Sequence, residues 1–209
     1  MKYKTKNPYS EEPLPWSEYI PMNADKLILG TFPTKKGNRD FEFFYPNKNN
    51  NFWKVLARIA EIKLSDFDET EKGKASAIEE RKKILDKLNL GITDIGAKVF
   101  RHNDSSLDNA LFPVEFTDIF QIITENPKIE NVILTSSSKG HSVLSWFNTY
   151  CSMNDITLLV DKKSKEFPKR TTINVSGKKI NIIIVYSTSR LAGKSEDLLT
   201  EQYGNALLT

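Results

Sequence analysis

The stretch from Gly30 to Trp53 brings together residue types that suit the recognition of a flat, polar ring. A short apolar run ends at Gly30, where the lack of a side chain lets backbone approach a ligand closely. The loop that follows carries the aromatic pair Phe44 and Tyr45 and then a run of asparagines. An aromatic ring offers a stacking face for a base, and an asparagine amide offers a donor and an acceptor for its edge. Phe44 and Tyr45 are equally consistent with a place in the core.

A carboxylate and a cluster of hydroxyls stand in two further segments. Asp94 ends an apolar run, where it could accept a hydrogen bond from a base N–H or act as a weak base toward water. A turn-forming aspartate is the alternative. The segment Ser187–Leu191 offers hydroxyls, backbone N–H groups and the cation of Arg190, all of which suit a phosphate. Leu191 suits the gap left by an extruded base, or ordinary loop packing.

The elements that must position these residues follow from the hydrophobic pattern. Apolar residues at Phe52, Val55, Leu56 and Ile59 fall on one face of a helix. The other predicted helices carry Ile84, Leu85 and Leu88, span Val114–Thr124, carry Val143, Leu144 and Phe147, and span Glu196–Leu208. The predicted strands are Lys26–Leu29, Ile92–Ile95, Asn131–Leu134, Ile156–Val160, and the hairpin Thr171–Val175 with Lys179–Tyr186 around Ser176-Gly177. Ser65–Lys74 and Gly96–Pro113 are expected to be connecting loops.

Strands that alternate with helices predict an α/β fold, a three-layer α/β/α sandwich with a central, mainly parallel sheet. In such sheets, ligands bind at the carboxyl ends of the strands. The loops after Leu29, Ile95, Leu134 and Tyr186 are therefore expected to converge on one site. The proline-bearing residues 1–25 are expected to form an extended lead-in that lies over a domain of residues 26–209.

Composition excludes several classes of protein. Of the 209 residues, 39% are hydrophobic and 27% charged, as in an ordinary globular chain, and the longest apolar runs are too short to span a membrane. One cysteine and two histidines argue against a disulfide, a cysteine zinc site or an iron–sulfur cluster. We expect a cytoplasmic monomer that uses no cofactor and no metal. The net charge of +3 permits a nucleic-acid partner without demanding one.

Three motifs in this order resemble the uracil-DNA glycosylase superfamily. The first is a strand, then Gly30-x-x-Pro33, then an aromatic pair, then an asparagine before Phe52-Trp53 at a helix start. The second joins the strand that ends at Asp94 to Ser106-Leu107-Asp108, and the third is the serine loop that begins at Ser187. The chain is most similar to the hypoxanthine-DNA glycosylase and mismatch-specific uracil-DNA glycosylase branches.

This resemblance implies a metal-independent, monofunctional DNA glycosylase that flips a deaminated base, uracil or hypoxanthine, out of DNA and hydrolyses its N-glycosidic bond. Its partner would be DNA that contains such a base. Asn50 and Asp94 would be the catalytic residues, with Asn50 positioning the attacking water. The base would be bound by Gly30, Thr31, Phe32, Phe44 and Tyr45, and the DNA by Ser187, Thr188, Ser189, Arg190 and Leu191.

Several of these assignments have alternatives. Many superfamily members carry a water-activating Asp or Asn where this chain has Phe32, so a non-catalytic member that binds nucleic acid or a base is the second hypothesis. Asn50 could instead cap the helix, although Asn51 lies closer to the cap position, and Asn49 and Asn51 are register alternatives for the family's asparagine. Plain helix capping is also the expectation for Ser106 and Asp108, and it is weighed equally with phosphate binding for Ser136, Ser137, Ser138 and Lys139.

Overall fold

Four parallel strands and one antiparallel edge strand form the central sheet of the protein. The structure is a computed structural model that describes residues 7–138, 140–161 and 166–208. The strand order is β3-β2-β6-β8-β7, and β7 alone runs antiparallel to its neighbour. The bounds are β2 Lys26–Gly30, β3 Leu90–Asp94, β6 Asn131–Leu134, β7 Lys169–Val175 and β8 Lys178–Ile184. The predicted turn between β7 and β8 is confirmed, since Ser176 and Gly177 both have positive φ, as a tight hairpin turn requires.

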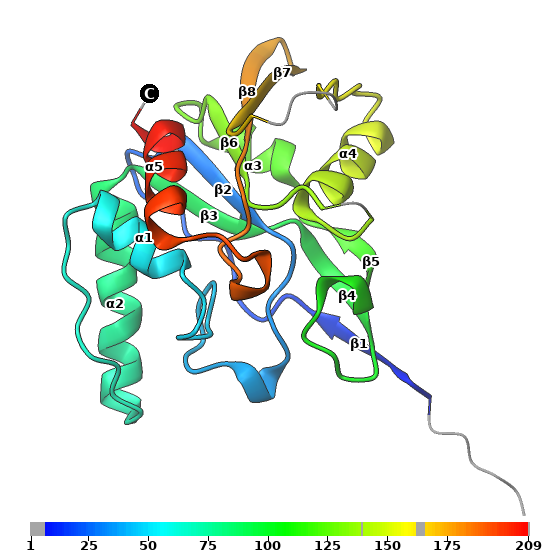
Figure 1. Cartoon of the computed structure of the whole chain (residues 1–209). Coiled ribbons are helices and arrows are strands. Elements are labelled where there is room, and N and C mark those ends of the chain that lie inside the picture. The colour runs from blue at the N-terminus through cyan, green and yellow to red at the C-terminus, as the bar shows by residue number, and fades with distance from the viewer. Residues whose placement is uncertain (1–6, 139, 162–165, 209) are drawn as a thin grey trace, which may run out of the picture.

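Alternating side chains of the sheet enter two separate hydrophobic cores, because successive residues of a strand point to opposite faces. Leu27 and Leu29 of β2 pack with α3 (Ile119–Glu125) and α4 (Val143–Met153). Ile28 between them packs with the helices of the opposite face, α1 (Phe52–Ile59), α2 (Glu71–Lys87) and α5 (Glu196–Leu207). Figure 1 shows these two groups of helices on opposite sides of the sheet. The predicted α/β sandwich with a mainly parallel central sheet is confirmed.

A second, antiparallel sheet is a feature that the hydrophobic pattern did not predict. Its strands are β1 (Tyr9–Pro13), β4 (Gly96–His102) and β5 (Leu111–Phe116), in the order β1-β4-β5. The prediction of a loop over Gly96–Pro113 is therefore wrong, and so is the first turn of the helix expected over Val114–Thr124. Pro113 is tolerated within β5 because β5 is an edge strand, where a missing N–H breaks no ladder bond.

The remaining differences are local. Ile156–Val160 forms no strand, and Ile156, Leu158 and Val160 pack as partly buried side chains against one core. Short 3-10 turns occur at Lys36–Asn38, Asp108–Ala110 and Arg190–Ala192. Among the described residues, no helix is long and apolar enough to cross a membrane.

Arg101 of β4 ties the segment before β2 to the loop after β2. Its side chain is fully buried. The guanidinium donates from Nε to the Glu12 carboxylate at 2.9 Å, from Nη1 to the carbonyl of Ser105 at 2.6 Å, and from Nη2 to the carbonyl of Pro33 at 2.8 Å. One buried cation thus bonds the lead-in, the loop after β4 and the loop after β2, and it holds these segments together near the carboxyl ends of the parallel strands.

Replacement of this cation should destabilise the whole domain. We expect Arg101→Met to lower the free energy of unfolding by about 3 kcal/mol, because a partly buried carboxylate and two carbonyls lose their buried partner. Urea denaturation measures the change. Lys98→Met is the matched control, since Lys98 lies on the same strand and pairs with Glu115 at the surface, where such a pair contributes at most about 1 kcal/mol. Equal losses in the two variants would contradict the anchoring role of Arg101.

Candidate functional site

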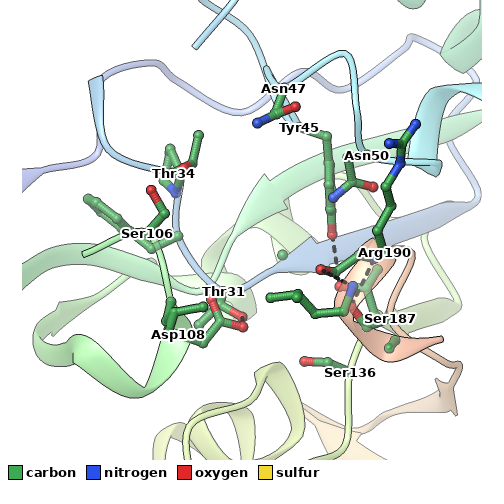
Figure 2. Close-up of a pocket in the computed structure, with 18 of the residues that line it drawn as sticks. Thr31, Thr34, Tyr45, Asn47, Asn50, Ser106, Asp108, Ser136, Ser187 and Arg190 are labelled. Carbon is green, nitrogen blue, oxygen red and sulfur yellow. Dashed lines mark hydrogen bonds between the residues drawn. The ribbon is translucent and has the colours of Figure 1, made fainter. Parts of the chain in front are cut away.

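A cavity of about 650 Å³ lies at the carboxyl edge of the parallel strands. Its walls come from segments 30–34, 45–50, 106–108, 135–138 and 186–194, together with Asp94 at the end of β3. The predicted convergence of the segments after Leu29, Ile95, Leu134 and Tyr186 is therefore confirmed, although residues 106–108 reach the cavity from the loop between β4 and β5 and not directly from the end of β3. Figure 2 shows side chains from each of these loops around the cavity, with Tyr45 and Asn50 from the loop before α1 and Arg190 from the late loop.

The floor of the cavity depends on a glycine that faces a carboxylate. Gly30 and Asp94 are register partners at the ends of β2 and β3. A Cβ atom on Gly30 would lie 2.0 Å from the Asp94 Oδ1 atom and 3.2 Å from the Tyr45 hydroxyl. The space beside Gly30, where a ligand was expected to approach the backbone, is thus occupied by the protein's own Asp94 carboxyl group.

Asp94 is buried without a bonding partner. Only 5% of its surface is exposed, yet its carboxyl oxygens make no hydrogen bond or ion pair within the described residues. Burial is the main cause that raises the pKa of Asp94 to about 7; the negative charge of Asp108 acts in the same direction, and Arg39 opposes the shift. A buried carboxyl whose bonding capacity is unused, at the wall of a cavity, is a typical mark of a ligand site.

Asp108 is the functional candidate that the sequence analysis assigned to helix capping. That prediction is wrong, because the 3-10 turn that begins at Asp108 has no side-chain cap. Its carboxylate instead lines the cavity and accepts a long hydrogen bond of 3.4 Å from the Thr31 hydroxyl. Burial raises the pKa of Asp108 to about 6, against the opposing effects of Thr31, His141 and Arg101. Ser106 does not cap either, and its hydroxyl accepts from the Asn38 amide at 2.8 Å.

Tyr45 supplies the aromatic wall of the cavity. Its ring stacks on Phe52, with centroids 3.7 Å apart and an interplanar angle of 10°, so only the opposite face is left for a ligand. The Thr135 hydroxyl donates to the carbonyl of Leu29 at 2.8 Å and must therefore accept from the Tyr45 hydroxyl, also at 2.8 Å. The backbone φ of Tyr45 is 48°, an unfavourable value for an aromatic residue. Strained backbone conformations of this kind are found preferentially at functional sites.

The structure corrects the assignments of Phe44 and Phe32. The Phe44 ring is fully buried, packs edge-on against Trp16 and Phe43, and does not line the cavity. It therefore has no face open to a base. Phe32 does line the cavity, but it is 7% exposed and belongs to the core that contains β4 and α4. Phe32 also packs closely beside Gly96, where an added Cβ atom would lie 3.2 Å from the Phe32 ring and 2.9 Å from the Trp146 ring.

Asn50 holds its amide in one orientation. Its Oδ1 atom accepts from the backbone N–H of Phe52 at 2.9 Å and from the Thr188 hydroxyl at 2.8 Å. A backbone N–H can only donate, so the oxygen must face it, and the NH₂ group is left to donate toward the cavity that Asn50 lines. Asn51 occupies the N-cap position of α1 but makes no side-chain cap bond, so Asn50 has the capping role as well. Asn49 also lines the cavity, whereas Asn51 does not.

The late loop is shaped by its own hydroxyls. Ser187 Oγ accepts from the N–H of Ser189 at 3.2 Å, and Ser189 Oγ accepts from the N–H of Leu191 at 3.3 Å. Thr188 is 1% exposed, its hydroxyl donates to Asn50, and it does not line the cavity. Its side chain is therefore not available to a phosphate. By contrast, Leu191 is 82% exposed and stands at the cavity rim beside the exposed Arg190.

The serines after β6 line the cavity, and one of them also bonds the start of α4. Ser136, Ser137 and Ser138 line the cavity, and the Ser136 hydroxyl accepts from the N–H of Val143 at 3.0 Å. The N-cap of α4 is Ser142, which forms a capping box with Ser145. Lys139 lies outside the described residues.

Neither histidine stands as a candidate nucleophile or metal ligand. The Nδ1 atom of His141 lies 3.0 Å from the carbonyl of Leu111, and the His102 ring packs against Tyr9 in the small sheet at an interplanar angle of 43°. Within the described ranges, no group of three or more His, Cys, Asp or Glu side chains is arranged to hold a metal ion.

Comparison with known proteins gives a fold and no closer relationship. No protein-family model and no curated protein matches the chain. Among solved structures, the chain is similar to the solution NMR structure of "a putative Uracil DNA glycosylase from Methanosarcina acetivorans", with a TM-score of 0.59 and 17% sequence identity. The similarity covers 93% of this chain and 97% of that one. The two proteins therefore share an α/β fold over nearly their whole length, and function has to be argued from the cavity.

The raised pKa of Asp94 predicts a specific dependence of stability on pH. An unfolded aspartate has a pKa of about 4, so the folded protein, with a pKa of about 7, binds this proton more tightly. Its contribution to stability is complete below about pH 4 and is lost as the pH rises through about 7. We expect Asp94→Asn to raise the free energy of unfolding by about 1–3 kcal/mol at pH 8, with a smaller gain at pH 5.

Urea denaturation of both proteins at the two pH values measures this difference. Asp104→Asn is the control, since Asp104 is exposed in the same loop as Asp108 and its surface ion pair with Lys35 contributes less than about 1 kcal/mol. A gain for Asp94→Asn that does not change with pH, or a loss of stability at pH 8, would contradict the assignment of a buried, unbonded carboxyl.

Proposed function

We propose that this protein is a DNA glycosylase that excises a deaminated base, uracil or hypoxanthine, from DNA. The observation that carries the proposal is the unbonded, buried carboxyl of Asp94 at the floor of the cavity, where an oriented amide and one free aromatic face also meet. The fold shared with a protein described as a uracil DNA glycosylase supports it. So do the three motifs that led to the same family from the sequence.

The cavity has the features expected of a pocket for an extruded base. Its volume of about 650 Å³ lies within the usual range for small-ligand sites. A base would stack on the free face of Tyr45, while Asp94 and the backbone of Gly30 and Thr31 would read its edge. The polar side chains that line the cavity are mostly carboxyl, amide and hydroxyl groups, which suit the N–H and C=O edge of a deaminated base.

Asn50 would position the attacking water. Both lone pairs of its Oδ1 atom already accept hydrogen bonds from Phe52 and Thr188, so only the NH₂ group is free. An NH₂ group can hold the oxygen of a water but cannot take its proton. The proton acceptor must therefore be a carboxylate. The carboxyls of Asp94 and Asp108 line the same cavity.

Contact with DNA would come from the rim. Arg190 and the N–H groups of the serine loop suit a phosphate, and the exposed Leu191 suits the space that a flipped base leaves in the stack. The net charge of +3 fits a protein that contacts a few phosphates.

A second candidate is a member of the same superfamily that binds nucleic acid or a base without excising it. The observation that favours it is Phe32, an apolar side chain at the place where many superfamily members carry the water-activating Asp or Asn. The two candidates differ in whether any base is released.

A single-turnover assay on DNA that contains uracil, hypoxanthine or xanthine tests the choice. We expect release of at least one of these bases, and a fall in rate of about 10²-fold or more for Asn50→Ala and for Asp94→Asn, since each removes a group that acts on water or base. Asn51→Ala is the matched control, because the neighbouring asparagine makes no side-chain cap bond and does not line the cavity; its rate should stay within about twofold of wild type. No release of any base at high enzyme concentration would exclude the enzyme and favour the binding protein.

Leu191 gives an independent test of base flipping. Because extrusion from a duplex costs a few kcal/mol, Leu191→Ala should slow excision from duplex DNA by about tenfold and leave excision from single-stranded DNA nearly unchanged. Leu208→Ala is the control, since this residue is also exposed and follows the last helix. Equal losses on both substrates would indicate a packing role instead.

A further inference from the structure

Two carboxyl groups lie over consecutive residues at the end of β2. Asp94 covers Gly30, where its Oδ1 atom occupies the space of a missing side chain, and Asp108 accepts from the hydroxyl of Thr31. Both line the same cavity. They reach it from different segments, the end of β3 and the loop between β4 and β5, so no local helix or turn accounts for their presence in one cavity.

The bonding capacity of this pair is almost unused. Asp94 is more than nine-tenths buried and makes no hydrogen bond or ion pair within the described residues, and Asp108 has only the long bond from Thr31. Buried carboxylates are ordinarily paired with cations or with several donors, because an unpaired buried charge is costly. Carboxyls left open toward a cavity are therefore arranged for a group that is not part of the protein.

We infer that Asp108 is a second catalytic residue of the proposed excision, and that Asp94 and Asp108 hold one proton between them and give it to the departing base. This inference rests on the proposed function. Two neighbouring carboxyls cannot both ionise readily, since each negative charge disfavours the other. One member of the pair is then a proton donor at a pH where an ordinary aspartate is fully ionised.

The step balances in atoms and charge. The bond between the sugar carbon and the base nitrogen breaks, its electron pair goes to the base, and the base takes the proton held by the pair. The oxygen of the water held by Asn50 forms the new bond to the sugar carbon. One proton of that water replaces the proton that the pair has lost, so Asp94 and Asp108 end as they began.

The electrostatic surroundings are consistent with a single shared proton. Burial raises the pKa of Asp94 to about 7 and that of Asp108 to about 6, and the charge of Asp108 contributes to the shift of Asp94. The pair therefore holds one proton between about pH 6 and 7. The other charged or titratable groups that act on the pair or line its cavity are Arg39, Tyr45, Arg101, His141, Tyr186, Arg190 and Lys194.

Asp108→Asn tests the inference, with Asp104→Asn of the same loop as the control. In the wild type, the single-turnover rate should be highest between about pH 6 and 7 and fall on both sides, because one member must be protonated and the other ionised. In Asp108→Asn the rate at pH 7 should fall about 10²-fold, the acid limb should disappear, and binding of DNA should stay within about twofold. Asp108→Ser replaces this variant if it does not fold. A positioning role alone would not change the pH profile.

A measurement without DNA separates this inference from the proposed function. In carboxyl ¹³C NMR, Asp108→Asn should lower the pKa of Asp94, while Asp104→Asn should leave it unchanged. If the wild type excises a base but Asp108→Asn keeps its rate and pH profile, the inference is overturned and the proposed function stands. An unchanged titration of Asp94 in Asp108→Asn also overturns the inference. If the wild type excises no base, the proposed function and the catalytic role of Asp108 both fall, whatever the titration shows.

Discussion

The absence of a side chain at position 30 is the constraint on which the site depends. Parallel pairing of β2 with β3 sets Gly30 opposite Asp94, and the carboxyl of Asp94 occupies the volume that any Cβ at position 30 would need. The same missing atom leaves room for the hydroxyl of Tyr45. The glycine at this one position thus allows both a buried carboxyl group and the Tyr45 side chain to lie at the base of a single cavity, and the other lining residues surround them.

Three hydrogen bonds connect this arrangement to the central sheet, to α1 and to the late loop. The link from Tyr45 through Thr135 to the carbonyl of Leu29 fastens the aromatic ring to the end of the central sheet. The bond between Asn50 and Thr188 joins the start of α1 to the late loop, two segments that are far apart in the sequence. Tyr45 and Asn50 each use one side-chain atom to hold the structure and leave another part of the side chain for the cavity, so structural and chemical roles are not alternatives here.

The extent to which the sequence predicted this structure follows from how each segment is stabilised. The central sheet and α1 were predictable, because strands buried on both faces and a helix with one apolar face leave strong patterns. The small sheet was missed, because neither strand shows a clean alternation of buried and exposed residues. In β4 the buried positions include glycine and arginine, and β5 contains a proline and exposes four of its six residues.

Within the site, sequence alone could place Asp94 at a strand end but not decide between Phe44 and Tyr45. The positive φ of Tyr45 turns that ring toward the cavity, whereas Phe44 enters the core, and no local pattern reports such a choice. Asp108 was taken for a cap because only long-range pairing of β4 and β5 brings it back to Thr31.

Position 32, in the loop after β2, carries a phenylalanine and no acidic or amide group, and the structure shows where the acidic groups of the cavity come from instead. Phe32 packs into the core beneath the loop after β2, and a polar side chain buried there would lack partners. The acidic groups of the cavity come instead from the end of β3 and from the loop before β5, and they reach the same strand end at Gly30 and Thr31. An acid on a neighbouring strand can reach the same part of the cavity as an acid on the loop itself, provided that no side chain at the start of the loop blocks it. Gly30 has no side chain there, so the Asp94 carboxyl has access. A phenylalanine at position 32 therefore does not deprive the cavity of the acidic groups that the proposed chemistry needs.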